Sequence, residues 1–401
     1  MNSKHMVLKI KQKSILMFTF LATLFFNALG WSKIVDATTV SKVSVYIFVL
    51  LPMVIGILLL AIQMVRGTLR LFYFKELLVG IALFALFIGV SLIKSYQTGK
   101  FAVGTFGEAA RIVAPFIYTF IVVNILSLED IDKLMILTLY VAWVAYLINQ
   151  FIITGASQRT ASISFIDSSS PFENSEVAAI AFAVACYFIY FLKRHPIYCF
   201  WSILLSIACF KRVLMLFTIV LFLYSVKLNK TKRLNRLVKW PLLLVTSAIF
   251  LAVTVFYLYI MEPQNLAWTW EKLHFDVDSF SMYRSYRVQY LLQHNYVSYG
   301  LSSSTSFLNT NPGSWYTNHT LELDLIKILI ELGEMPLIIF VLAYYSLAYE
   351  SMYAYLVTTA FLGNLLMASG LNEYYAWFVM LVTFALIRHN NVIDENYGED
   401  K

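Results

Sequence analysis

Charged side chains are scarce in this chain. Asp, Glu, Lys and Arg make up 13% of its 401 residues, whereas 60% of the residues are hydrophobic and 16% are aromatic. A soluble domain carries about a quarter charged residues, so water cannot be the main solvent of this chain. The low charge excludes an ordinary soluble enzyme. We interpret the net charge of +7 as basic loops beside a membrane, not as a nucleic-acid surface.

Motifs for cofactors and metals are also missing. The three cysteines, Cys186, Cys199 and Cys209, lie in apolar segments without a CxxC pair or a nearby histidine cluster. We therefore expect them to be buried packing residues. The sequence contains no Gly-rich phosphate loop, no zinc-ligand spacing and no internal repeat. It predicts neither nucleotide hydrolysis nor a metal or other cofactor.

Long apolar segments follow one another along the whole chain. A helix needs about 20 apolar residues to cross the hydrocarbon core, and about twelve such segments are present. We expect an all-α polytopic membrane protein in which residues 1–401 form a single integral membrane domain. The basic start and the apolar run after it resemble a signal peptide, but no small-residue cleavage site follows, so this run is interpreted as a retained first helix. The expected helices are 14–30, 43–65, 74–93, 108–126, 134–154, 174–192, 196–210, 213–228, 238–260, 321–348, 352–369 and 374–388.

The basic residues indicate an orientation. With the N-terminus inside, the inner segments carry more than twice as many Lys and Arg residues as the short outer segments, which follows the positive-inside rule. Both termini are then cytoplasmic. The count requires two helices around 209–212, because one merged helix would place the basic loop 227–239 outside.

The connection 261–320 is then a large outer loop. It contains Trp268, Trp270, Trp315 and several tyrosines, which is too aromatic for a solvated tether. Helical spacing within it predicts an amphipathic helix along the membrane surface. The residues with this spacing are Phe280, Tyr283, Arg287, Tyr290 and Leu291.

Two parts of this loop carry candidate chemistry. Arg284 and Arg287 are three residues apart on the expected surface helix and form either a diphosphate clamp or a contact with anionic headgroups. His319 precedes the next helix and is either a structural hydrogen-bonding residue or a base for a sugar hydroxyl.

Other charged residues have more than one interpretation. Lys211 and Arg212, between two apolar runs, are either interfacial anchors or an anion site. Arg111, Arg159, Asn372 and Glu373 are more simply surface residues, although all are expected on the outer face. The charged residues of 320–332 are expected to be solvated; they are Glu322, Asp324, Lys327 and Glu331. The carboxylates of Glu322 and Asp324 are also favoured near a helix N-terminus.

Read together, these features resemble the superfamily of O-antigen ligases and Wzy-type polymerases. The resemblance rests on order: Arg159 before a helix start at 172–179, Lys211-Arg212 at the end of a helix pair, and then the long loop. That loop carries the arginines, a Tyr299-Gly300 turn and Asn318-His319, and it leads into a helix with Glu331-Leu-Gly333.

The resemblance implies a GT-C-like glycosyltransferase in the bacterial inner membrane, with a large periplasmic loop of short amphipathic helices. It implies that Arg212 and Arg284 hold the lipid diphosphate, that Arg287 supports them and that His319 is the base. Further substrate contacts are expected at Lys211, Arg159, Arg111, Asn318 and Tyr283. The implied partners are undecaprenyl-diphosphate-linked donor and acceptor glycans, the lipid bilayer and a chain-length regulator protein, with no nucleic acid.

We expect a metal-independent polymerase that moves the growing glycan onto a new lipid-linked repeat unit. A ligase that transfers glycan to lipid A core would use the same kinds of site residues and differ in its acceptor. A flippase for lipid-linked oligosaccharides is the alternative from another class, although two similar halves and charges in mid-membrane would be expected of it.

Overall fold

The computed structural model describes residues 3–28, 39–69, 71–153, 175–229, 237–310 and 320–398. These ranges are helical with short connections, and they contain no β-strand. Within these ranges, each apolar segment expected to be a helix overlaps a helix, although the segment 134–154 ends in a π-helix and the segment 321–348 forms two α-helices. The all-α fold class is therefore confirmed for the described part of the chain.

Several of these helices can cross a membrane. Within the described ranges, 5 helices are long and apolar enough to do so. They are Ile47–Val65, Phe74–Thr98, Thr105–Ile125, Leu128–Phe151 and Trp240–Met261. Shorter apolar helices cover Val177–Tyr190, Pro196–Ala208, Glu334–Ala348 and Met352–Met367.

The chain divides into two compact units. Unit 1 comprises 1–77, 114–235 and 373–401, and unit 2 comprises 78–113 and 236–372. The helices α4 (Phe74–Thr98) and α5 (Thr105–Ile125) contribute to both units.

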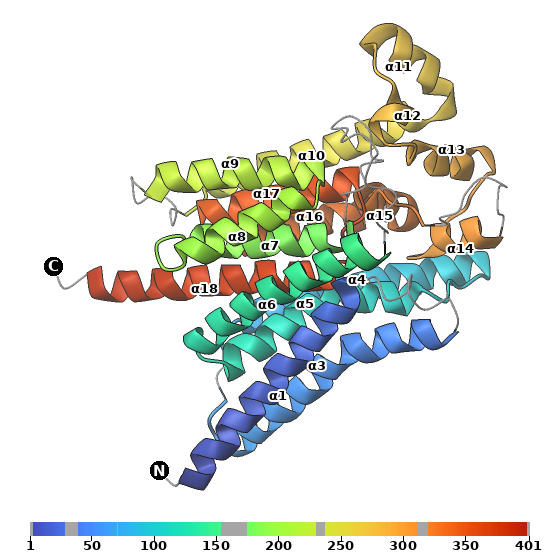
Figure 1. Cartoon of the computed structure of the whole chain (residues 1–401). Helices are drawn as coiled ribbons and strands as arrows, with labels where there is room; N and C mark the ends of the chain where they lie inside the picture. The colour runs from blue at the N-terminus through green and yellow to red at the C-terminus, as the bar shows by residue number, and fades with distance from the viewer. Residues whose placement is uncertain are drawn as a thin grey trace. The chain divides into compact units, whose positions relative to one another are not determined.

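A central apolar helix organises unit 1. Residues 177–189 of α7 are almost completely buried, as expected for a helix that is hydrophobic on all sides. Helix α7 lies beside α8, α9 and α18 (Figure 1), and it also contacts α6. Helix α1 packs against α3 and α6. The bounds are α1 Ser3–Ala28, α3 Thr39–Val65, α6 Leu128–Ile148 followed by the π-helix η1 Asn149–Ile153, α7 Ser175–Tyr190, α8 Pro196–Ala208, α9 Arg212–Asn229 and α18 Tyr374–Gly398.

Local signals define helix ends in unit 1. Ser127 and Asp130 form a capping box at the start of α6, and the Asp130 carboxylate also lies 2.5 Å from Nζ of Lys13 in α1. Helix α8 ends at Ala208 and α9 begins at Arg212, which confirms two separate helices around 209–212. The three cysteines, all of which the structure describes, form no disulfide and are buried, as expected for packing residues.

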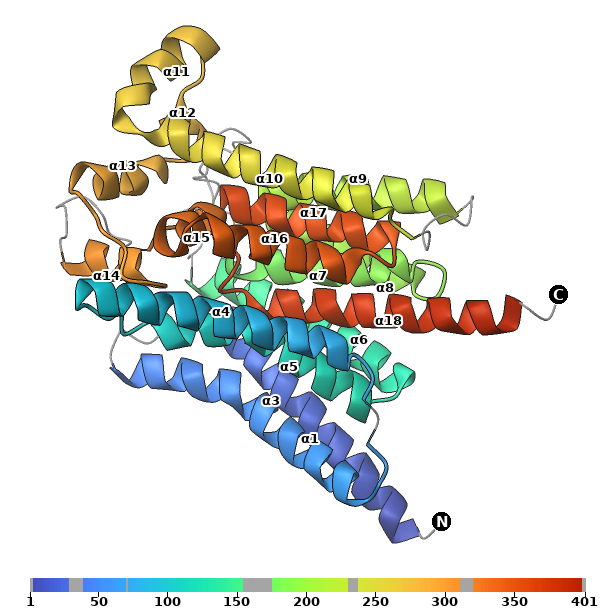
Figure 2. The same cartoon turned by 180° about the vertical axis from the view of Figure 1, so that it is seen from behind.

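Unit 2 contains a helix break that was not expected from the sequence. Its helix α10 (Trp240–Met261) packs against α16, and α15, α16 and α17 (Met352–Met367) pack together (Figure 2). The expected single helix 321–348 is wrong, because α15 (Asp324–Leu332) and α16 (Glu334–Ala348) are separated by Gly333 with φ 100°. A left-handed glycine ends a helix readily. With 9 residues, α15 is too short to cross a membrane.

The long connection between α10 and α15 folds into short helices. They are η3 (Pro263–Asn265), α11 (Leu266–Leu273), α12 (Val277–Phe280), α13 (Ser285–Gln293) and α14 (Ser303–Thr310). The continuous surface helix expected over 280–291 is wrong, because Met282 and Tyr283 adopt φ values of 54° and 62°. The N–H of Tyr283 donates to the carbonyl of Asp278 at 2.7 Å, which closes a turn between α12 and α13.

Candidate functional site

The structure describes most of the candidate residues. Arg111, Tyr283, Arg284 and Arg287 lie in unit 2, whereas Lys211 and Arg212 lie in unit 1. Arg159, Asn318 and His319 lie outside the described residues.

The two arginines of the long connection share one carboxylate. Nε of Arg284 lies 3.0 Å from Oε2 of Glu322, and Nη1 of Arg287 lies 3.4 Å from Oε1 of the same residue. The three side chains are 15–23% exposed. Two guanidinium groups against one carboxylate leave an excess positive charge. Planar guanidinium groups suit phosphate oxygens, so this cluster can bind an anion.

Arg287 is also bonded to the chain that enters α15. Its Nη1 donates to the carbonyl of Thr320 at 2.9 Å. Thr320 directly follows His319 in the sequence. The arginine cluster therefore contacts the residue that follows the candidate base in the sequence.

The start of α13 is held by a network around Asp278. Its Oδ1 accepts from Oγ of Ser285 at 2.5 Å and from Nε2 of Gln289 at 2.9 Å. Oγ of Ser281 donates to Oγ of Ser285 at 2.9 Å. Ser281 and Ser285 are buried. These bonds fix Arg284, which is the N-cap residue of α13, although it makes no side-chain cap.

Exposed aromatic rings lie beside the arginines in the chain. The Tyr283 side chain is 59% exposed, and its ring centroid lies 5.5 Å from that of Tyr286 with an interplanar angle of 37°. Aromatic faces with wet polar tips suit contact with sugar rings.

The charged face of α15 is buried, contrary to the expectation of solvated charges. Asp324, Lys327 and Glu331 are 3%, 6% and 0% exposed. Nζ of Lys327 lies 2.7 Å and 2.6 Å from the two carboxylate oxygens of Glu108 in α5. Hydropathy cannot distinguish a buried ion pair from a solvated one. The signal that was available is the spacing of 324, 327 and 331, which places these residues on one helix face.

The two carboxylates of this face bind backbone amides. Oδ2 of Asp324 accepts from the N–H groups of Gly370 and Leu371 at 2.5 Å and 2.7 Å. Glu331 accepts from the N–H of Ser302 at 2.8 Å and from the N–H and Oγ of Ser304 at 2.9 Å and 2.6 Å. Helix α15 is thus bonded to α5, to the turn before α14 and to the chain after α17.

Burial shifts the pKa values of the charged residues on this face of α15. It raises the pKa of Asp324 to about 6 and that of Glu331 to about 7, although Lys327 and the backbone donors oppose this rise. Burial also opposes the charge of Lys327, but Glu108 and Glu331 outweigh it and raise the pKa of the lysine.

Arg111 joins the same end of α15. Its Nη1 donates to Oδ1 of Asn372 at 2.8 Å, and Asn372 directly follows Leu371, which is bonded to Asp324. Glu322, the partner of Arg284 and Arg287, is two residues before Asp324. Arg284 and Arg287 therefore bond directly to the segment 320–322, whereas Arg111 bonds to Asn372, next to a residue that binds Asp324.

Lys211 and Arg212 lie in unit 1. Lys211 is in the turn between α8 and α9, and Arg212 is the first residue of α9. Both side chains are half-buried. Among the residues that the structure describes, no group of three or more His, Cys, Asp or Glu residues is placed to hold a metal ion.

Comparison with known proteins adds no relative. No protein-family model matches the chain, and no curated protein or solved structure matches it significantly.

Proposed function

We propose that this protein is a Wzy-type polysaccharide polymerase. It moves a growing glycan from undecaprenyl diphosphate onto a new undecaprenyl-diphosphate-linked repeat unit. The observation that carries the proposal is the pair Arg284 and Arg287, which share Glu322 and leave one positive charge available for an anionic substrate.

The reaction needs little beyond these groups. The bond between the anomeric carbon and the diphosphate oxygen breaks, and a bond to the acceptor hydroxyl oxygen forms. The arginines neutralise the leaving diphosphate, which is the largest charge to develop. The acceptor proton passes to a base, for which the sequence offers His319. Undecaprenyl diphosphate is the second product.

Two further features support a large lipid-linked substrate. The long connection is a chain of short helices with exposed Trp270 and Tyr283, at 60% and 59% exposure, which can contact sugar rings. Arg111 adds another cation at the same end of α15. In the proposed arrangement the chain crosses the bacterial inner membrane about twelve times in a GT-C-like fold, with both termini cytoplasmic and this site facing the periplasm. A chain-length regulator is the proposed protein partner.

The test uses purified full-length protein in liposomes with the lipid-linked repeat unit. A ladder of glycan products on a gel is expected. Arg284→Ala and Arg287→Ala should each lower the rate by about 100-fold, the usual effect of removing one group that stabilises developing charge. The His319→Ala variant should make no ladder of products.

The matched control is Lys272→Ala, which removes an exposed cation of α11 in the same connection. It should retain the ladder. A ladder that survives both Arg284→Ala and His319→Ala would refute the site. Folded protein that makes no ladder but transfers glycan to lipid A core is a ligase, and one that only moves the substrate across the bilayer is a flippase.

A further inference from the structure

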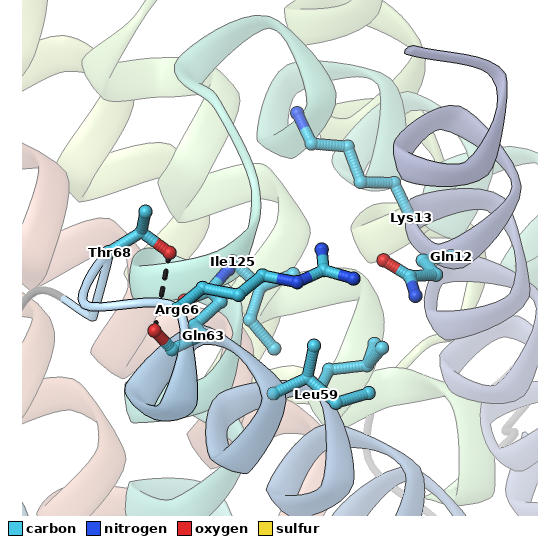
Figure 3. Close-up of a pocket in the computed structure, with 8 residues that line it drawn as sticks. Gln12, Lys13, Leu59, Gln63, Arg66, Thr68 and Ile125 are labelled. Carbon is cyan, nitrogen blue, oxygen red and sulfur yellow. Dashed lines mark hydrogen bonds between the residues drawn. The ribbon is translucent and has the colours of Figure 1, made fainter. Parts of the chain in front are cut away.

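A cavity lined by both polar and apolar side chains lies in unit 1. It has a volume of about 300 Å³ and lies between α1, the C-terminal end of α3 and Ile125 at the end of α5. Gln12 from α1 and Arg66 from the end of α3 point toward one another across it (Figure 3). This volume is at the lower end of the range for small-molecule sites, so it fits a headgroup, not a whole lipid.

Backbone hydrogen bonds fix the C-terminal end of α3 beside this cavity. Gly67, with φ 64°, follows the helix, and its N–H donates to the carbonyl of Met64 at 3.0 Å. The N–H of Thr68 donates to the carbonyl of Gln63 at 2.9 Å, and Oγ1 of Thr68 donates to the same oxygen at 3.3 Å. This is a Schellman motif, which satisfies carbonyl groups at the helix end. The polar character of the cavity therefore comes from side chains.

These side chains include groups without a partner. Among the described residues, Arg66 forms no ion pair, and Oε1 of Gln63 is buried without a hydrogen-bond partner. Lys13 is different, because Asp130 neutralises it at 2.5 Å. One cation and one amide thus remain available to a ligand. An unsatisfied buried polar atom is unfavourable, so a ligand that bonds to Gln63 would be stabilising.

The same cavity has an apolar side that leads along α3. Leu59 and Ile62 line it, and the neighbouring side chains Ile57 and Leu58 are 53% and 58% exposed on a helix that can cross a membrane. Lipid acyl chains cover such a face. A ligand with an anionic head and an apolar body fits both the cavity and the helix beside it.

We propose that this cavity binds the headgroup of an anionic glycerophospholipid. The phosphate contacts Arg66, a hydroxyl of the headgroup donates to Gln63, and the acyl chains lie along the exposed face of α3. Charge counting places Lys13 and Arg66 on the cytoplasmic side, where anionic lipids attract basic residues. The proposal is independent of glycan transfer.

The test measures lipid retention by the purified full-length protein in nanodiscs of phosphatidylcholine with phosphatidylglycerol. Native mass spectrometry is expected to show phosphatidylglycerol bound in preference to phosphatidylcholine. Arg66→Gln should weaken this binding about fivefold, the effect of one basic residue at an anionic surface. Gln63→Leu should weaken it further in the double variant. The matched control is Lys75→Gln, an exposed basic residue expected on the same side of the membrane but not lining the cavity, and it should bind as the parent does.

Three results would overturn the proposal. The first is equal retention by Arg66→Gln and the parent, provided that both have the same melting temperature. The second is equal retention of phosphatidylcholine and phosphatidylglycerol. The third is that inorganic phosphate alone displaces the lipid and raises the melting temperature as much as phosphatidylglycerol does, because the ligand would then be free phosphate.

Discussion

Lys327 and Glu108 form a buried ion pair that joins α15 to α5. The lysine Nζ lies 2.6 Å from Oε2 of Glu108, and the two side chains are only 7% and 18% exposed. A buried pair of this kind is worth less than its geometry suggests, because both charges have lost water. Removing one partner, however, leaves the other charge buried and unpaired, which costs free energy.

Lys327→Met should therefore be strongly destabilising. We expect a loss of about 3–5 kcal/mol in the free energy of unfolding, because the largely buried Glu108 carboxylate loses its partner. In the described part of unit 2, Lys327 is the only cation that forms an ion pair with Glu108, and its charge also stabilises Glu331. The measurement is the melting temperature of the purified protein in detergent. The double variant Lys327→Met with Glu108→Gln should recover part of the loss. A double variant as unstable as the sum of both single variants would contradict the direct pairing.

The buried carboxyl of Glu331 predicts a pH dependence of stability. Its pKa is raised from 4.5 to about 7, so the folded protein binds this proton more tightly than the unfolded chain does. The free energy of unfolding should therefore fall as the pH rises from about 4.5 to about 7, and this contribution should be constant above that range. Glu331→Gln should flatten the fall.

Melting temperatures between pH 5 and pH 8 test this expectation, each value being compared with the parent at the same pH. Glu334→Gln is the control, because Glu334 is an exposed carboxyl at the start of α16. It should retain the full pH dependence. A parent protein that becomes more stable as the pH rises through this range would contradict the raised pKa.

Gly300 is required for close packing as well as for its backbone angle. Its φ is 111°, and an added Cβ would lie 2.7 Å and 2.8 Å from Cβ and Cα of Ser91 in α4. Gly99 also has a positive φ, 65°, but nothing lies within 4 Å of its added Cβ. Gly99→Ala should cost about 1–2 kcal/mol from the backbone alone.

Gly300→Ala should cost about 1–3 kcal/mol more than Gly99→Ala, because the turn must move away from α4. Thermal unfolding of both variants measures the difference. Equal losses would show that Ser91 can yield without cost.

Asp278 should position Arg284 without touching the substrate. Asp278→Ala removes the acceptor of Ser285 and Gln289, so hydrogen exchange should become faster in the first turns of α13. Asp276→Ala is the matched control: Asp276 receives bonds from Ser279 and the N–H of Asp278, which lower its pKa, and it caps α12 only. Its effect should remain within 277–280.

In the proposed reaction, Asp278→Ala should lower kcat more than it raises KM, because the guanidinium group is retained but poorly placed. The opposite split would indicate that Asp278 contributes to substrate binding itself.

The sequence allowed the helices to be predicted because a membrane imposes a simple requirement on them. Long apolar runs mark α3, α4 and α10 without ambiguity. The break at Gly333 was not predicted because hydropathy averaged over the length of a membrane span stays high across it, despite Glu331 and Glu334. Gly333 and the nearby Pro336 are ordinary signals for a helix end and a new start, and they would have located the break.

The site was predictable only in part. Arg284 and Arg287 were visible as a pair, but their shared partner Glu322 is more than thirty residues away in the sequence. Such pairings depend on tertiary structure. The bond between Arg111 and Asn372 spans an even longer separation, and only the common expected side of the membrane suggested it.

The carboxylates of α15 accept hydrogen bonds from backbone N–H groups, which affects which substitutions the bonded segments tolerate. Asp324 and Glu331 recognise peptide N–H groups of Leu371 and Ser302, and the side chains of these two residues take no part in the bonds. Every residue type except proline offers the same N–H, so these two bonds do not specify the side chains at 371 and 302. At 302 the side chain is restricted instead by burial and by a φ of 67°. Proline alone lacks the N–H, so a proline at 371 or 302 would remove one bond to the helix, and the bonds from Gly370 and Ser304 would have to hold the segments.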